Sequence, residues 1–150
     1  MAERTESSIV INAPADRVMD VIADVLAYPQ WSDGVRSVEI LTTYEDLRPA
    51  DVVFAVDAGA IKDTYQLEYD WSDDNRVVTW HLTSGEMLKA MDGAYRLTES
   101  GSGTQAATTT VVYQLAVDVS IPMIGMIRRK AEKVIVDTAL KGLKERVEKG

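Results

Sequence analysis

The sequence contains no cysteine and only one histidine among its 150 residues. Without cysteine there can be no disulfide, no thiolate metal ligand and no cysteine nucleophile. A single imidazole also leaves the usual histidine-based metal sites short of ligands. The chain has no Gly-x-Ser-x-Gly turn, phosphate-binding loop or dinucleotide fingerprint either. We therefore expect no metal and no cofactor, and we assign no catalytic residue.

Long apolar runs are also missing. No segment approaches the eighteen consecutive apolar residues of a membrane-spanning helix, and residues 1–6 lack the apolar run of a signal peptide. The hydrophobic fraction is 46% and the charged fraction is 27%, as in ordinary globular domains. These features predict a cytoplasmic protein, without a transmembrane segment, that folds as a single domain over residues 1–150.

Acidic residues outnumber basic ones, giving a net charge of −8. The last thirty residues nevertheless contain eight Lys and Arg against four Asp and Glu, so the acidic excess lies in the first 120 residues. An acidic body argues against nucleic-acid binding, which needs a clustered basic face. The basic segment could contact an anionic lipid or partner, but a solvated helix face explains it more simply.

Hydrophobic periodicity predicts an α+β chain in the order strand, two short helices, six strands and one long helix. An amphipathic helix follows Pro14, with Val18, Val21, Ile22 and Val25 on one side. A second short helix covers roughly 25–30, and residues 31–34 form a loop. The predicted strands are 7–11, 35–43, 51–57, 61–71, 76–84, 86–98 and 104–118, and short turns between them imply antiparallel neighbours.

The last helix, predicted over 121–150 with Pro122 near its start, carries two apolar stripes rather than one. The first stripe is Ile124, Ile127, Ala131, Val134, Ile135, Thr138 and Gly142, and the second is Val136, Leu140, Leu143 and Val147. Two arrangements remain open. In one, the second stripe packs on the sheet while a bend turns the first half of the helix towards a cavity. In the other, one stripe covers a cavity and the other meets a second subunit, making a homodimer.

Several short stretches resemble bacterial polyketide cyclase/dehydrase-like members of the START and birch-pollen-allergen-like (SRPBCC) superfamily. They are Ile11-Asn12-Ala13-Pro14 with Val18, Tyr28-Pro29-Gln30-Trp31, Val78-Thr79-Trp80, Gly93-Ala94-Tyr95 and Leu140-Lys141-Gly142-Leu143-Lys144. The resemblance implies a helix-grip fold, in which a curved antiparallel sheet of about seven strands surrounds a long C-terminal helix. It also implies an apolar cavity between the sheet and that helix.

Two ionisable residues are candidates for proton transfer. Alternation places His81 opposite Val78, Trp80 and Leu82, so we expect it to face solvent. Asp63 falls on the same side of its predicted strand as the apolar residues, and a carboxyl group in that position could be a buried general base. We favour the simpler interpretation that Asp63 is hydrated at the cavity rim or in a turn.

Aromatic side chains carry the stronger signal, because six of them occupy strand positions that we assign to the inner face. Buried tyrosines need hydrogen-bond partners, so a cluster of them suggests an interior that is not wholly dry. Alternation alone leaves open whether they fill space or line a cavity, and the resemblance favours the cavity. The predicted ligand-binding residues are Tyr65, Tyr69, Trp71, Trp80, Leu82, Tyr95, Tyr113, Met123, Ile127 and Ala131.

Three functions compete on these grounds. The first is binding or transport of a hydrophobic small molecule, such as a lipid, an isoprenoid or a polyketide, in that cavity. The second is a polyketide cyclase or dehydratase in which tyrosine hydroxyls or Asp63 move protons. The third is a protein–protein module, which predicts a cavity too small for any ligand.

Overall fold

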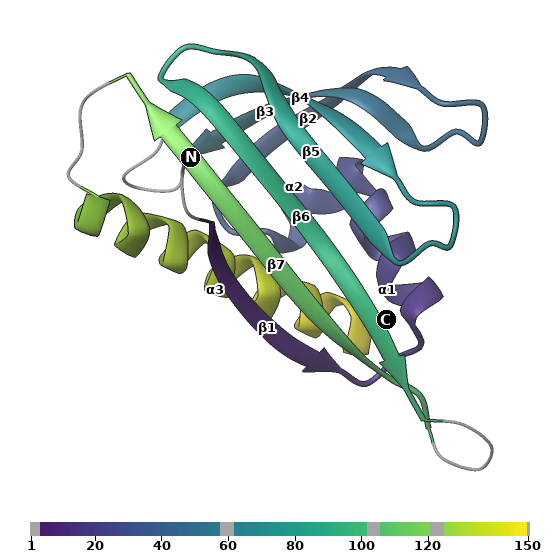
Figure 1. Cartoon of the computed structure of the whole chain (residues 1–150). Coiled ribbons are helices and arrows are strands. Elements are labelled where there is room, and N and C mark those ends of the chain that lie inside the picture. Colours follow the sequence, from purple (N-terminus) through teal and green to yellow (C-terminus); the bar gives the residue numbers. More distant parts are fainter. Residues whose placement is uncertain (1–3, 58–61, 102–105, 121–124, 150) are drawn as a thin grey trace.

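The computed structural model describes residues 4–57, 62–101, 106–120 and 125–149 (Figure 1). The predicted ligand contact Met123 and the predicted helix opener Pro122 therefore lie outside the described residues. In chain order the elements are β1 (Thr5–Ile11), α1 (Ala15–Ala23), a 3₁₀ helix (Val25–Ala27), α2 (Tyr28–Trp31), β2 (Val35–Thr43), β3 (Pro49–Asp57), β4 (Lys62–Trp71), β5 (Val77–Gly85), β6 (Leu88–Ser100), β7 (Thr108–Val119) and α3 (Gly125–Lys149).

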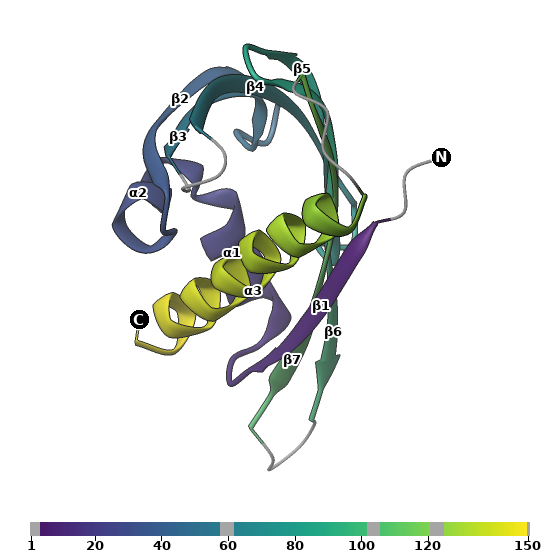
Figure 2. The same ribbon diagram turned by 90° about the vertical axis from the view of Figure 1, so that its left-hand side faces the viewer.

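The strands form one antiparallel sheet in the order β1-β7-β6-β5-β4-β3-β2. The chain crosses from one edge of the sheet to the other through α1 and α2, and then returns strand by strand until β7 pairs with β1. Figure 2 shows the sheet curling around α3, which lies across its open side. The predicted helix-grip architecture, with two short helices after the first strand, is confirmed.

Helix α1 closes one end of the barrel-like sheet. Its apolar side is buried completely at Val18 and Met19, and almost completely at Ile22, as the amphipathic pattern predicts. The helix start is tied to a distant strand, because the backbone N–H of Ala15 donates to Oε1 of Glu99 at 2.7 Å. Asp16 in the first turn forms an ion pair with Arg76 at 2.9 Å. These contacts fix one end of the space beneath the sheet.

The two apolar stripes of α3 have different roles within one chain. The second stripe, Val136, Leu140, Leu143 and Val147, is between 0% and 3% exposed and belongs to the main core. The first stripe reaches the hollow of the sheet at Val134, Ile135 and Thr138, but Ile127 and Val134 are also exposed to solvent. The second stripe is therefore covered within the monomer, and the first is covered only in part. The homodimer stays a prediction.

A buried carboxylate attaches α3 to the sheet. Glu132 is 1% exposed. In the sequence nothing distinguishes it from the solvated charged residues of the same helix. Its Oε1 accepts a hydrogen bond from the Thr5 hydroxyl at 2.7 Å, and its Oε2 accepts one from the Val117 backbone N–H at 2.8 Å. A buried carboxylate needs such donors to offset its lost hydration. Glu132 therefore holds β1, β7 and α3 in a fixed relation.

Candidate ligand cavity

The concave face of the sheet and α3 enclose a cavity of about 430 Å³. That volume would hold on the order of 14 waters at ~30 Å³ each, and it falls within the roughly 300–1,000 Å³ usual for small-molecule sites. From α3 the cavity is lined by Val134, Ile135, Thr138 and Ala139. The aromatic lining consists of Tyr28, Phe54, Tyr65, Tyr69, Trp80, Tyr95 and Tyr113.

The aromatic rings form a connected wall rather than isolated fillers. Tyr95 and Tyr113 have ring centroids 4.6 Å apart, and Trp80 lies 5.4 Å from the first and 5.6 Å from the second. Phe54 stacks on Tyr65 with centroids 5.7 Å apart. Edge and offset contacts of this kind stabilise each ring beyond its area burial. The wall is therefore rigid before any ligand arrives.

Gly93 gives the Trp80 ring its place in this wall. The two residues are direct cross-strand partners on β6 and β5. A Cβ added at Gly93 would lie 2.3 Å from the Trp80 ring, which is far inside contact distance. Only a residue without a side chain allows the indole to lie flat over the neighbouring strand. The width of the cavity at Trp80 thus depends on this glycine.

Four tyrosine hydroxyls inside the cavity have no hydrogen-bond partner among the described residues. They belong to Tyr65, Tyr69, Tyr95 and Tyr113. By contrast, the hydroxyl of Tyr28, also on the wall, donates to the backbone carbonyl of Ile22. These hydroxyls are open to water, because among the described residues Nε1 of Trp31 is the one buried side-chain polar atom without a partner. Water or a ligand in the cavity can therefore accept their hydrogen bonds.

The four phenols are neutral donors at ordinary pH. Burial is the largest cause that raises the pKa of Tyr65, Tyr69, Tyr95 and Tyr113 above the ordinary value of 10.0. Neighbouring carboxylates or phenols raise it further, including Asp63 beside Tyr65. A phenol of this kind can donate a hydrogen bond to a carbonyl or hydroxyl oxygen, but it does not act as a base near neutrality.

Five of the ten predicted ligand-binding residues line the cavity: Tyr65, Tyr69, Trp80, Tyr95 and Tyr113. Four others, Trp71, Leu82, Ile127 and Ala131, lie outside this lining. Trp71 stacks on Tyr69 at the end of β4, and its indole N–H donates to the carbonyl of Pro49 at 2.8 Å. Leu82 is half-buried next to the register shift between β4 and β5.

The remaining two of these residues lie on α3. Ile127 is 52% exposed and Ala131 is half-buried, and neither lines the cavity. The helix reaches the cavity one to two turns later, at Val134, Ile135, Thr138 and Ala139. Gly142, in the first stripe, lets α3 approach α2, because a Cβ there would lie 2.8 Å from the carbonyl oxygen of Trp31.

Two wall residues, Phe54 and Tyr28, were not among the predicted contacts. Phe54 alternates with Val52 and Val56 in a predicted strand, so its inward direction was readable from the sequence. Tyr28 starts α2, and strand alternation says nothing about a helix. Its ring packs 4.9 Å from Trp31 and 6.1 Å from Phe54.

Asp63 is buried, which corrects the prediction of a hydrated side chain. It is 5% exposed, and its two carboxylate oxygens accept four backbone N–H groups at 2.8–3.1 Å. The donors are Thr64, Glu86, Met87 and Leu88, so the carboxylate holds the turn between β5 and β6. All its bonds go to backbone amides and it does not line the cavity. Asp63 is therefore a structural residue.

Replacing Asp63 with Ala should lower the free energy of unfolding by about 3 kcal/mol. The substitution leaves four backbone donors without their acceptor, and bonds to a charged group are worth about 1.5–3 kcal/mol each before relaxation and hydration. Equilibrium unfolding in urea measures the change. Asp73→Ala, at an exposed position in the β4–β5 turn, is the matched control and should change stability little. Equal effects of the two substitutions would contradict the structural role of Asp63.

His81 lies on the outer face of the sheet, as predicted. Its side chain is 46% exposed and its Nε2 lies 3.3 Å from a carboxylate oxygen of Glu68. Among the described residues there is no group of three or more His, Asp or Glu side chains that could hold a metal ion. None of the described helices is long and apolar enough to cross a membrane.

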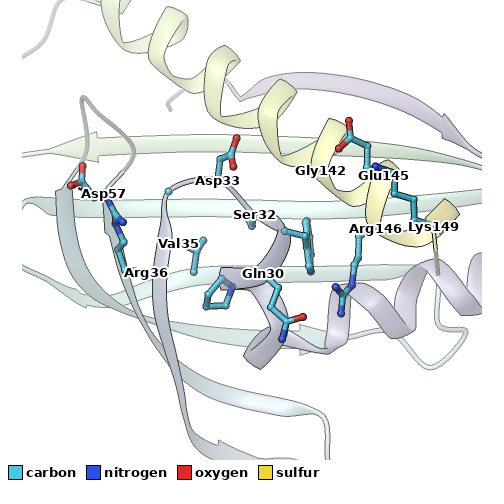
Figure 3. A pocket seen from close by; sticks show the side chains of 13 residues that line it. Gln30, Ser32, Asp33, Val35, Arg36, Asp57, Gly142, Glu145, Arg146 and Lys149 are labelled. Atoms are coloured by element: carbon cyan, nitrogen blue, oxygen red, sulfur yellow. Dashed lines mark ion pairs between the residues drawn. The ribbon is translucent and has the colours of Figure 1, made fainter.

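A second, open groove of about 770 Å³ lies outside the cavity, between α3 and the segment that joins α2 to β2 (Figure 3). It is polar and of mixed charge: Arg146 and Lys149 enter from α3, and Arg36 pairs with Asp57 at 3.7 Å on the sheet edge. The groove and the cavity share residues 32–35 and Asp57. Residues 32–35 therefore line both the groove and the cavity.

The sequence profile of the polyketide cyclase/dehydrase and lipid transport family matches residues 11–144. The chain belongs to this family. No curated protein matches the sequence. The family match confirms the resemblance read from the short stretches of sequence, and it fits the apolar cavity described above. The family includes both cyclases or dehydrases and lipid carriers, so membership leaves the choice between conversion and transport open.

Solved structures place this family member within a common fold. A START superfamily protein from Mycobacterium smegmatis superposes with a TM-score of 0.89 at 21% identity, covering 98% of each chain. The Zhui aromatase/cyclase from a Streptomyces species gives a TM-score of 0.79 at 20% identity, over 99% of this chain and 95% of its own. A protein from Thermus thermophilus gives 0.80 at 25% identity, over 97% of each chain. The first two likenesses concern the fold alone.

Proposed function

We propose that this protein binds a hydrophobic small molecule with several oxygen acceptors, such as a lipid, an isoprenoid or a polyketide, and holds or transports it in the cavity. The observation that carries the proposal is the set of unpartnered hydroxyls of Tyr65, Tyr69, Tyr95 and Tyr113 inside an otherwise largely apolar enclosure. A hydrocarbon would leave these donors unsatisfied, whereas carbonyl or hydroxyl oxygens would satisfy them.

Apolar burial supplies the affinity in this account. A ligand that buries about 300 Å² gains about 7.5 kcal/mol at ~25 cal/mol per Å². The loss of translational and rotational freedom on association costs a free energy of similar size, about 4–15 kcal/mol. The hydrogen bonds from the phenols then decide which apolar molecules bind well. Specificity for oxygenated ligands is the expected result.

The alternative function is cyclisation or dehydration of a poly-β-ketone in the same cavity, and the four free phenols are the observation that favours it. They can polarise ketone oxygens of a folded chain. Conversion also needs a base, and the carboxylates that line the cavity, Asp33 and Asp57, lie in the part of the wall shared with the outer groove. Product formation from an oligoketide, lost in Tyr→Phe variants that still bind it, would favour conversion over carriage.

The third function, a protein–protein module with a closed interior, required a cavity too small for a ligand. The cavity of about 430 Å³ does not meet that requirement.

Removing single hydroxyls tests the proposal. Tyr95→Phe and Tyr113→Phe should each weaken binding of an oxygenated ligand about fivefold, since one hydrogen bond is worth about 1 kcal/mol. Binding of a hydrocarbon of the same shape should stay unchanged. Because burial raises the pKa of both phenols above 10.0, the effect should be constant between about pH 6 and pH 9.

Displacement of a fluorescent apolar probe measures both affinities. Tyr44→Phe is the control, because that hydroxyl donates to the Tyr69 carbonyl and Tyr44 does not line the cavity. Equal weakening of oxygenated and hydrocarbon ligands by the cavity variants would show that the hydroxyls do not select the ligand.

A further inference from the structure

Three large apolar side chains are exposed within the first ten residues of α3. Met126 is 73% exposed, Ile127 is 52% exposed and Val134 is 61% exposed. Other exposed large apolar residues of the described chain, such as Leu26 and Leu47, lie on separate elements, and single residues of that kind are ordinary. A group of three on one helix is a patch that needs an explanation.

A cation lies within the patch. Ile127 and Val134 are seven residues apart and project from the same side of the helix, and Lys130 lies between them at the i+3 and i−4 positions. Lys130 is exposed, and the structure shows no ion pair for it among the described residues. We call Met126, Ile127, Lys130 and Val134 the docking face.

No exposed acid interrupts this face. Between residues 126 and 136 the single carboxylate is Glu132, which is buried and accepts its hydrogen bonds from β1 and β7. The next carboxylate, Asp137, is already bound by Lys133 at 3.0 Å and by the Ser7 hydroxyl at 2.7 Å. The docking face is thus apolar and positive, on a protein whose net charge is −8.

The docking face is continuous with the ligand cavity. Val134 is both exposed and part of the cavity lining, and Ile135 and Thr138 continue the lining inwards. Figures 1 and 2 show that α1 and α2 lie beside the C-terminal half of α3, so neither helix covers the N-terminal half. The docking face and the cavity lining therefore meet at Val134.

We propose that the docking face binds the surface of a bilayer that contains anionic phospholipids, so that the cavity lining at Val134 is brought to the membrane. Apolar side chains interleaved with Lys and Arg suit the boundary between acyl chains and charged headgroups. The acidic remainder of the chain is repelled by the same surface, which sets the orientation. Delivery of ligand from the bilayer rests on the proposed function, whereas docking itself does not.

A second copy of the chain fits the docking face less well than a membrane does. In a two-fold dimer each docking face would meet its own equivalent, which would bring Lys130 of the two copies close together. Like charges in a desolvated contact are costly. The anionic membrane supplies the opposite charge.

Vesicle flotation tests the proposal. The full chain should float with vesicles of phosphatidylcholine and one-third phosphatidylglycerol, and only weakly with phosphatidylcholine alone. Raising the salt concentration to about 0.5 M should release it, because screening shortens the reach of the headgroup charge. Ile127→Asp and Lys130→Glu should each weaken binding to the anionic vesicles about tenfold or more.

Two matched controls separate the docking face from general changes in charge or polarity. Leu47→Asp introduces the same side chain at an 80% exposed position in the β2–β3 turn, and Arg96→Glu reverses an exposed charge on β6. Both should float nearly as the unmodified chain does. All four variants should keep their affinity for an apolar probe in solution, so failure of docking is distinguishable from failure of ligand binding.

Several outcomes would overturn the proposal. They are absence of flotation, equal flotation with both vesicle types at high salt, or equal flotation of the docking-face variants and the controls. Sedimentation showing a dimer that Ile127→Asp dissociates, together with no vesicle binding, would assign the face to a second copy instead.

Discussion

Replacing Thr138 with Trp should lower the affinity for apolar ligands about 100-fold without unfolding the protein. Thr138 lines the cavity from α3 and is only half-buried, so an indole there can extend into the empty space without displacing the core. If it excludes about 120 Å² of ligand contact, the loss is about 3 kcal/mol at ~25 cal/mol per Å². That free energy corresponds to about two decades of affinity.

Lys141→Trp is the matched control for this variant. It introduces the same side chain on the same helix at an exposed position outside the cavity. Probe titration should show native affinity for Lys141→Trp, and thermal unfolding should show nearly equal midpoints for both variants. Unchanged affinity in Thr138→Trp would mean that the ligand does not occupy the space beneath α3.

Gly93→Ala should both destabilise the protein and close the cavity. The added methyl group would lie 2.3 Å from the Trp80 ring, and overpacking of this kind costs about 1–3 kcal/mol. Trp80 is held by Tyr69, Tyr95 and Tyr113 on its other sides, so relief requires the indole to shift towards the cavity. We expect at least a tenfold loss of ligand affinity together with the loss of stability.

The double variant Gly93→Ala with Trp80→Phe is the decisive control for this mechanism. A phenyl ring is smaller than an indole and leaves room for the methyl group, so the double variant should be more stable than the sum of the single changes predicts. Urea unfolding and probe titration of all four proteins complete the cycle. Strict additivity would show that the contact between Gly93 and Trp80 does not control the cavity.

The fold was predictable because each element has a local signal that agrees with the whole. Strand alternation identified the inward tyrosines, including Tyr95 and Tyr113, and the second stripe on the last helix packs in the core. The order of elements predicted an α+β layer architecture, and the resemblance of short stretches to a known superfamily implied the helix-grip fold. Local pattern and global packing agree most closely in the sheet.

The cavity lining was only partly predictable, because parity tells which face a residue occupies but not how far along the strand the cavity extends. Trp71 has the parity of Tyr69, yet it lies at the strand end, where the Arg48 guanidinium lies 5.1 Å from its ring centroid. On α3, helical periodicity gave the correct stripe but not the turn at which it meets the cavity. Ile127 is outside and Ile135 is inside.

Buried carboxylates were the least predictable feature. Glu132 looks like a solvated charge in the sequence, and strand alternation was the one sign that Asp63 points inwards; each is 5% exposed or less in the fold. Their partners are backbone N–H groups and a hydroxyl contributed by residues distant in the chain. Every residue except proline supplies a backbone N–H donor, so the sequence does not show which of them will lie near a given carboxylate.

Mass spectrometry of the intact protein under native conditions tests the central claim most directly. After incubation with paired ligands of equal size, one a hydrocarbon and one bearing several carbonyl or hydroxyl oxygens, the account predicts a one-to-one complex dominated by the oxygenated ligand. The same complex should be weak or absent in Thr138→Trp, whereas the control variant Lys141→Trp should form it as the unmodified chain does. A chain that takes up neither ligand, or that takes up both equally, would contradict the assignment of the tyrosine-lined cavity as an oxygen-selective binding site.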